Sequence, residues 1–286
     1  MTHVSARRGA LYVSVAATAW GTGGAAGSLL FDTGGLGPVG VSLWRYLLGA
    51  AFLLLLTRGT PFTWNGRTLL VGAGMAVYQT AYFAAIAHAG VALATVVTMG
   101  ATPVFTALGS RFLLRERLGR IALGALAAAL AGLLLLTGEA ALRAGSFPGI
   151  AFALVSAAGY AGVTLLSRHG RDDDPRAAAV GGFVVGAVCL APFALAEGVV
   201  PEVSWASVAL LGYLGAVPTA LAYGLFFRAL TALRATTVSI ISLGEAVGAA
   251  LLGVLLFGER LTPVAWSGCV LLLAAVTVLA ARAETA

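Results

Sequence analysis

The sequence Arg-Glu-Arg-Leu, at residues 115–118, occurs a second time as Gly-Glu-Arg-Leu at residues 258–261. The two copies lie half the chain length apart in a protein of 286 residues. Each copy ends one apolar segment and begins another, residues 91–114 and 121–137 around the first, and 235–257 and 264–281 around the second. A repeated unit of this length indicates that the chain consists of two halves with the same fold.

The composition indicates a membrane protein. Hydrophobic residues make up 60% of the chain, charged residues only 10%, and the mean hydropathy is +0.98, values that exclude an ordinary soluble protein. Ten stretches are long enough to cross a bilayer as helices: 9–30, 38–57, 67–87, 91–114, 120–138, 147–167, 177–196, 204–227, 235–257 and 262–282. No alternating strand pattern suggests a barrel, so we predict an all-α polytopic protein, with local kinks at Pro103, Pro192 and Pro218.

The basic residues predict the orientation in the cell membrane. All 17 are arginine. If the N-terminus is cytoplasmic, only Arg143 and Arg260 fall in external segments, and Arg45 falls within a span. Positive residues concentrate in cytoplasmic loops, so both termini are expected in the cytoplasm. The net charge of +6 reflects this bias, and no nucleic-acid partner is expected.

Each half contains an odd number of predicted spans, so the second half enters the bilayer upside down. The expected units are residues 1–140 and 141–286, two inverted five-helix repeats. Trp20 aligns with Tyr160, and Tyr82 with Tyr223 at nearly the same offset. Inverted repeats usually form a substrate site near the membrane midplane between the halves. Ten spans can enclose such a site alone, so we expect a monomer.

Several short motifs resemble the EamA-type drug/metabolite transporter superfamily. They are the Glu-Arg-Leu phrase after spans 4 and 9, Ala19-Trp20-Gly21, Trp44-Arg45-Tyr46, and Thr102-Pro103-Val104-Phe105. The resemblance covers essentially the whole chain. It implies a secondary transporter of small organic metabolites, such as amino acids, expected to export them by alternating access. Span 9 of this family often contains Glu-Pro; here Glu245-Ala246 predicts that the kink is lost.

Glu245 is the strongest candidate for a functional side chain. It lies about nine residues from the inner end of its span, and a charge at this depth costs on the order of 2.5–3.5 kcal/mol. On a regular helix it would share a small, partly polar face with Ser242, Gly248 and Ala249. The carboxylate could bind a substrate ammonium group or carry a coupling proton. Alternatively, it could be paired permanently with an arginine or with hydroxyl groups.

Arg45 is the second charged candidate. It lies about seven residues from the outer end of span 2, or roughly 10 Å of helix rise. Its guanidinium could hold a substrate carboxylate through two hydrogen bonds. It could also reach toward the outer surface, or form a fixed salt bridge with Glu245.

Aromatic and amide side chains at mid-membrane depth complete the set of candidates: Trp20, Tyr78, Gln79, Tyr82, Tyr160 and Tyr223. Tyr78 and Tyr82, and Gln79 and Tyr82, have the spacing of one helix face. Each could contact substrate or simply pack. Trp20 and Gln79 are favoured because their N–H groups need a partner at this depth.

The sequence gives no sign of an enzyme, a cofactor or a metal site. There is no HExxH motif, no paired intramembrane aspartate and no mid-span histidine, and a phosphate-binding loop is excluded because the chain has no lysine. Cys189 and Cys269 read as packing residues. Glu116 and Glu259 are expected to brace helix turns beside Arg117 and Arg260. The competing function is a proton-coupled multidrug carrier for lipophilic cations with Glu245 as its exchange site, and Arg45 argues against it.

Overall fold

The computed structural model describes residues 4–57, 65–116, 118–142, 147–170, 174–258 and 260–282, and this part of the chain is helical without strands. Two short segments, η1 and η2, are π-helical. The elements are α1 (Ala6–Gly34), α2 (Pro38–Thr57), α3 (Gly66–Gly109), η1 (Ser110–Leu114), α4 (Arg120–Leu142), α5 (Phe147–His169), α6 (Pro175–Glu197), α7 (Trp205–Gly215), η2 (Ala216–Leu221), α8 (Ala222–Ala232), α9 (Ala235–Ser242), α10 (Gly244–Phe257) and α11 (Pro263–Arg282).

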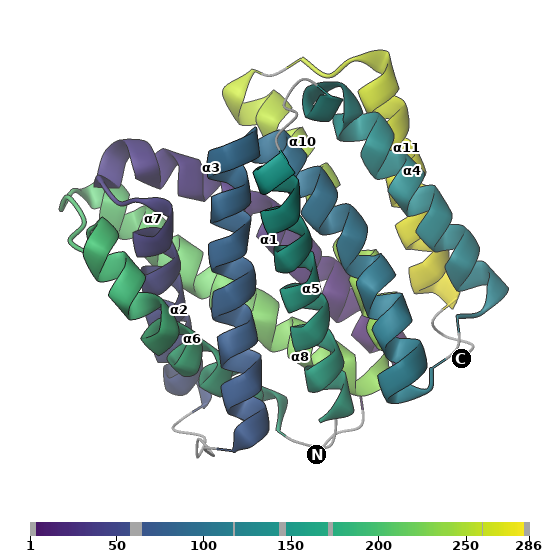
Figure 1. The fold of residues 1–286 in the computed structure, drawn as a ribbon, viewed down its shortest axis with the longest axis horizontal. Helices are drawn as coiled ribbons and strands as arrows, with labels where there is room; N and C mark the ends of the chain where they lie inside the picture. The colour runs from purple at the N-terminus through teal and green to yellow at the C-terminus, as the bar shows by residue number, and fades with distance from the viewer. Residues whose placement is uncertain are drawn as a thin grey trace.

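The helices form a bundle with both chain termini at the same end (Figure 1). Nine segments of the described residues are long and apolar enough to span a membrane. Helix α1, with 29 residues, lies in the same bundle and supplies the tenth span. The predicted fold class, ten transmembrane helices as two inverted five-helix repeats, is confirmed; the boundary between the repeats near residue 140 stays a prediction. We call the end with the termini the terminal end.

Helix α3 contains two spans joined without a loop. It has 44 residues and would measure about 66 Å if straight, twice the roughly 30 Å of a hydrocarbon core. Instead, it folds back on itself. The evidence is that the hydroxyls of Tyr82 and Thr95 lie 2.7 Å apart although 13 positions separate them in the sequence. In a straight helix they would be about 20 Å apart. The candidate spans on either side of the turn are Gly66–Ile86 and Leu93–Leu114.

Polar side chains mark where several helices begin. Asn65 accepts a hydrogen bond from the backbone N–H of Thr68 at 2.8 Å, at the start of α3. Asp174 and Ser204 cap α6 and α7 in the same way. Each cap satisfies one of the N–H groups that the first turn of a helix leaves without a partner.

Two spans of the second half deviate from regular α-helix. Pro218 lies in η2, between α7 and α8, whereas Pro103 and Pro192 lie inside α3 and α6. The ninth span is interrupted at Leu243, whose N–H bonds to the carbonyl of Ile240 three residues back. The helix is thus interrupted without proline, two residues before Glu245, although Leu243 keeps right-handed helical dihedral angles. The expectation that Glu245-Ala246 removes the kink stays a prediction.

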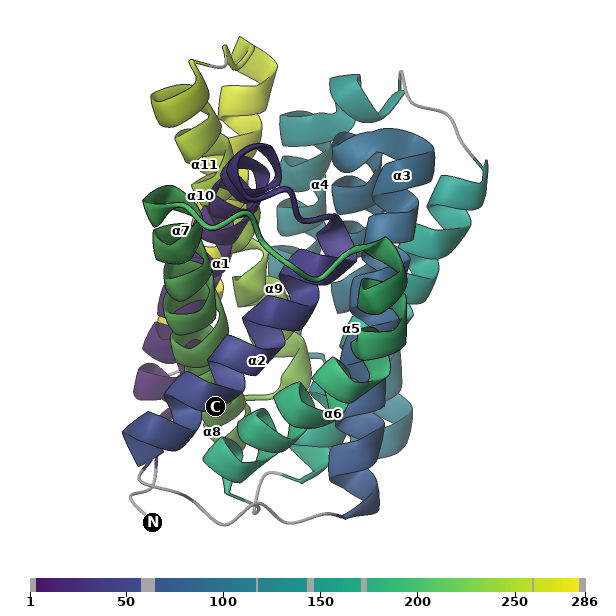
Figure 2. The ribbon, with the colours of Figure 1, turned by 90° about the vertical axis from the view of Figure 1, so that its left-hand side faces the viewer.

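Helices α1 and α10 approach closely through glycine. A Cβ atom added to Gly21 would lie 2.9 Å from the carbonyl oxygen of Glu245 and 3.1 Å from the Cα of Gly248. These are backbone atoms, which cannot rotate away. Figure 2 shows α2 running obliquely across the bundle, with α7 and α8 on one side and α5 and α6 on the other. Helices from the two halves are thus packed against each other rather than separated into two bodies.

We expect Gly21→Ala to destabilise the protein. Overpacking against backbone costs about 1–3 kcal/mol, which outweighs the roughly 1 kcal/mol that alanine adds to helix stability. The measurement is the melting temperature of the purified protein in detergent. Gly27→Ala on the same helix is the matched control, because its Cβ would meet nothing within 4 Å and the substitution should leave stability unchanged or higher. Equal melting temperatures for both variants would contradict the tight contact.

Candidate functional site

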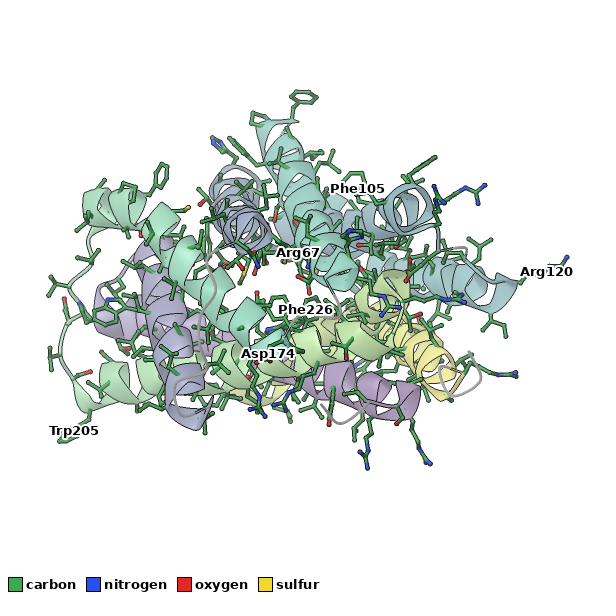
Figure 3. The ribbon with its side chains drawn as sticks, turned by 90° about the horizontal axis from the view of Figure 1, so that it is seen from below. Arg67, Phe105, Arg120, Asp174, Trp205 and Phe226 are labelled. Atoms are coloured by element: carbon green, nitrogen blue, oxygen red, sulfur yellow. The ribbon has the colours of Figure 1, made fainter. Side chains whose placement is uncertain are left out.

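Seven aromatic rings from six helices meet inside the bundle, and we call them the aromatic cluster: Trp20, Tyr46, Tyr78, Tyr160, Phe183, Tyr223 and Phe226. The ring centroids of Trp20 and Tyr223 are 5.0 Å apart, and those of Trp20 and Phe226 are 5.3 Å apart. Seen from the terminal end, Phe226 lies near the middle of the bundle, with Arg120 and Trp205 at its edges (Figure 3). The structure thus brings four predicted residues, Trp20, Tyr78, Tyr160 and Tyr223, into one cluster.

Some polar atoms of the aromatic cluster have hydrogen-bond partners, and one does not. The hydroxyls of Tyr78 and Tyr223 are hydrogen-bonded to each other, and the hydroxyl of Tyr46 donates to the carbonyl of Met75 at 3.4 Å. By contrast, the indole Nε1 of Trp20 is buried with no hydrogen-bond partner among the described residues. An unpaired N–H in such a place costs free energy that a bound acceptor would recover.

Arg45 is half-buried and is held from the second half of the chain. Its Nε donates to the hydroxyl of Thr219 at 3.3 Å, and that hydroxyl donates to the carbonyl of Leu214 at 2.6 Å, five residues back in the π-helical turn. A π-turn leaves a carbonyl free to accept such a bond. The remaining guanidinium N–H groups of Arg45 make no hydrogen bond within the described part of the chain.

Glu245 is the second residue of α10 and is also half-buried. The break at Leu243 places it in the first turn of a new helix, where the helix dipole favours a negative charge. The carbonyl oxygen of Glu245 approaches Gly21 on α1, directly after Trp20, so this residue lies next to the aromatic cluster. Arg45 and Glu245, both within the described residues, form no direct ion pair. The fixed salt bridge between them is therefore absent.

The other predicted residues find their partners inside the protein. The Gln79 amide donates to the hydroxyl of Ser42 at 3.2 Å, and the Tyr82 hydroxyl pairs with Thr95. The Ser242 hydroxyl donates to the carbonyl of Val238 at 2.9 Å. The hydrogen bonds of Gln79, Tyr82 and Ser242 are therefore made within the protein.

Sequence reasoning missed four residues of this region: Tyr46, Phe183, Phe226 and Thr219. Tyr46 directly follows Arg45, a signal that was available. Phe183 and Phe226 lie in uniformly apolar spans and look like ordinary core residues. Thr219 follows Pro218 inside a span, and a hydroxyl next to a helix-breaking residue at this depth could have marked it.

Comparison with known proteins identifies relatives of this chain. The chain is 30% identical over 287 residues to the uncharacterized transporter YwfM of Bacillus subtilis, covering 95% of this chain and 93% of that protein. An uncharacterized transporter of Archaeoglobus fulgidus is 34% identical over 218 residues, covering 74% and 76%. A solved crystal structure shares the fold with a TM-score of 0.83 at 23% identity, covering 96% and 98%.

The sequence pattern of the EamA-like transporter family matches this chain twice, at residues 7–138 and at residues 147–281. Both matches fall on sets of helices that the structure places in one bundle. The chain therefore belongs to the EamA-like transporter family and is a multi-pass membrane transporter.

Proposed function

We propose that this protein exports small zwitterionic metabolites, amino acids or similar molecules, as a secondary transporter that works by alternating access. The observation that carries the proposal is the placement of Arg45 and Glu245. They are opposite charges from different repeats, within predicted spans, half-buried and not paired with each other among the described residues. A molecule with a carboxylate and an ammonium group would complement both.

Energetics favour this interpretation over a structural pair. Burying two charges costs free energy, and direct contact with good hydrogen-bond geometry is what can offset that cost. A pair that served only to join two helices would be expected to form that contact. Keeping the charges apart gives up the direct contact, and a bound zwitterion would restore it on both sides. We therefore assign the substrate carboxylate to Arg45 and the ammonium group to Glu245.

The aromatic cluster supports a role in enclosing the substrate. Aromatic faces attract cations by about 0.5–2 kcal/mol, so Tyr223 and Trp20 would assist Glu245 in holding an ammonium group. The unpaired Nε1 of Trp20 would donate to a substrate oxygen. Discontinuous helices near the midplane, such as α9 and α10, commonly form sites of this kind between inverted repeats.

Thr219 is proposed to orient Arg45. By engaging Nε, it would leave the two Nη groups directed together toward a carboxylate, the geometry in which guanidinium binds with two parallel bonds. We further propose that the protein acts as a monomer in the cell membrane. The distribution of arginine supports cytoplasmic termini, so that the terminal end faces the cytoplasm.

A multidrug carrier for lipophilic cations is the alternative function. Glu245 and the aromatic cluster would suit a cation, and Glu245 would then exchange it for a proton. The positive charge of Arg45, which is bonded to Thr219 beside the aromatic cluster, weighs against this alternative because it repels a cationic substrate.

The first experiment is transport of a mixed pool of amino acids and small metabolites by proteoliposomes, with and without a pH gradient, read by mass spectrometry. We expect a zwitterion to be transported, and Arg45→Gln and Glu245→Gln each to reduce its rate at least tenfold, since a hydrogen bond to a charged group contributes about 1.5–3 kcal/mol. Arg120→Gln, an exposed residue at the edge of the bundle, is the control.

Two outcomes would contradict the proposal. Transport of lipophilic cations without any zwitterion would favour the multidrug function and make Arg45 structural. Unchanged transport in Glu245→Gln would remove Glu245 from the site.

Thr219→Val should raise the substrate KM with little change in the amount of folded protein. Valine has nearly the shape of threonine but cannot accept the bond from Arg45 Nε, so the guanidinium loses its orientation. The measurement is concentration-dependent uptake of the zwitterion found above. Thr219→Ser keeps the hydroxyl and should restore most of the affinity; if serine and valine behave alike, the hydroxyl does not position Arg45.

A further inference from the structure

The terminal end of the bundle contains an ion pair that lies outside the candidate site. The Nε of Arg168, at the end of α5, lies 3.1 Å from Oε1 of Glu116, and the two side chains are only 10% and 15% exposed. Arg168 also donates from Nη1 to the carbonyls of Leu230 and Thr231 at 2.8 and 3.2 Å. The guanidinium of Arg168 therefore supplies donors to carbonyls in the last turn of α8, which have no hydrogen-bond partner within the helix.

The other oxygen of Glu116 serves a third helix. Its Oε2 accepts a hydrogen bond from the backbone N–H of Ala235 at 3.3 Å, which caps the first turn of α9. The sequence predicted that Glu116 would brace its own turn beside Arg117. Arg117 lies outside the described residues, and the described contacts of Glu116 instead join the end of η1, in the first half, to α5 and α9, in the second half.

The two halves of the chain also contact each other next to this ion pair, through buried residues. The hydroxyls of Ser110 and Thr236 lie 3.3 Å apart, one from each half, and their side chains are 1% and 5% exposed. The carbonyl of Ser110 also accepts from the N–H of Glu116 at 3.0 Å. The Glu116–Arg168 pair and the Ser110–Thr236 contact thus connect the two halves at the same end.

The arrangement has no charged equivalent in the other repeat. At the sequence offset that pairs Trp20 with Tyr160, Arg168 pairs with Ser28. The Glu-Arg-Leu phrase is present in both halves, with Glu259 outside the described residues, but the arginine that Glu116 binds is present in only one. At this aligned position, the arginine that binds Glu116 is therefore specific to the second half of the sequence.

We propose that Glu116 and Arg168 form a latch that holds the terminal end of the transport pathway closed, so that the resting protein is open preferentially toward the opposite side. The latch rests on the alternating-access mechanism proposed above, and it is independent of the substrate. When the halves move apart at this end, Arg168 must leave Glu116 and the α8 carbonyls together. Removing either partner should shift the population toward the state that is open at the terminal end.

The test uses a reporter cysteine, Ser110→Cys, in the full-length protein with Cys189 and Cys269 replaced by alanine. The rate of its reaction with N-ethylmaleimide is measured on purified protein in detergent, without substrate. We expect Glu116→Gln and Arg168→Gln each to increase this rate roughly tenfold, the population change that corresponds to about 1.4 kcal/mol. Arg168→Lys keeps the charge but lacks the planar guanidinium that reaches Glu116 and the α8 carbonyls at once, so it should give a smaller increase.

The matched control is Arg176→Gln, which removes an exposed arginine from the same end and should leave the rate unchanged. Equal rates in the latch variants and the control would overturn the proposal. So would loss of the folded species in both glutamine variants with no increase in Arg168→Lys, which would make the ion pair purely structural. If the latch variants react faster but no protein, including the parent, transports any metabolite, the latch stands and the proposed substrate class fails.

Discussion

The arrangement of this protein depends on the cost of placing charge in a hydrocarbon environment. Arg45 and Glu245 lie at a depth where each must be stabilised by protein, and each is stabilised separately. Arg45 is held by Thr219 from the other half of the chain, and Glu245 by the start of α10. Because the two charges do not pair with each other, each needs partners from the surrounding protein, and Arg45 finds its partner in the other half of the chain. The aromatic cluster lies beside both residues.

Irregular backbone occurs beside both of these charges, as well as at η1 and at the turn in α3. The π-helical turn of η2 provides the threonine that binds Arg45, and the break at Leu243 provides the helix start that carries Glu245. A regular helix uses nearly all of its backbone groups internally and offers few to a polar side chain. Deviations from regular geometry in a membrane are tolerated where they line a polar region or are buried in protein. Here they coincide with both intramembrane charges.

The spans could be predicted from sequence because hydropathy alone defines them, whereas the orientation that the arginines predict stays a prediction. Trp20, Tyr78, Tyr160 and Tyr223 were recognised because a polar atom on an aromatic ring at depth is unusual. Phe183 and Phe226 were not, because a phenylalanine in an apolar span gives no sign of whether it faces lipid or the interior. The interruption at Leu243 was missed because the sequence has no proline there. Contacts between the halves, such as that of Thr219 with Arg45 or Glu116 with Arg168, depend on distances that sequence spacing does not contain.

The turn inside α3 has a consequence for how the chain is made. Residues 66–114 contain two spans that reverse direction without a polar connection, and the hydroxyls of Tyr82 and Thr95 bond across the turn. During synthesis the first of these spans cannot settle with a hydrophilic loop beyond it, because the next residues are themselves apolar. We therefore expect the two spans to enter the lipid together as one helical hairpin, and a tag or protease site placed at this turn to interfere with insertion.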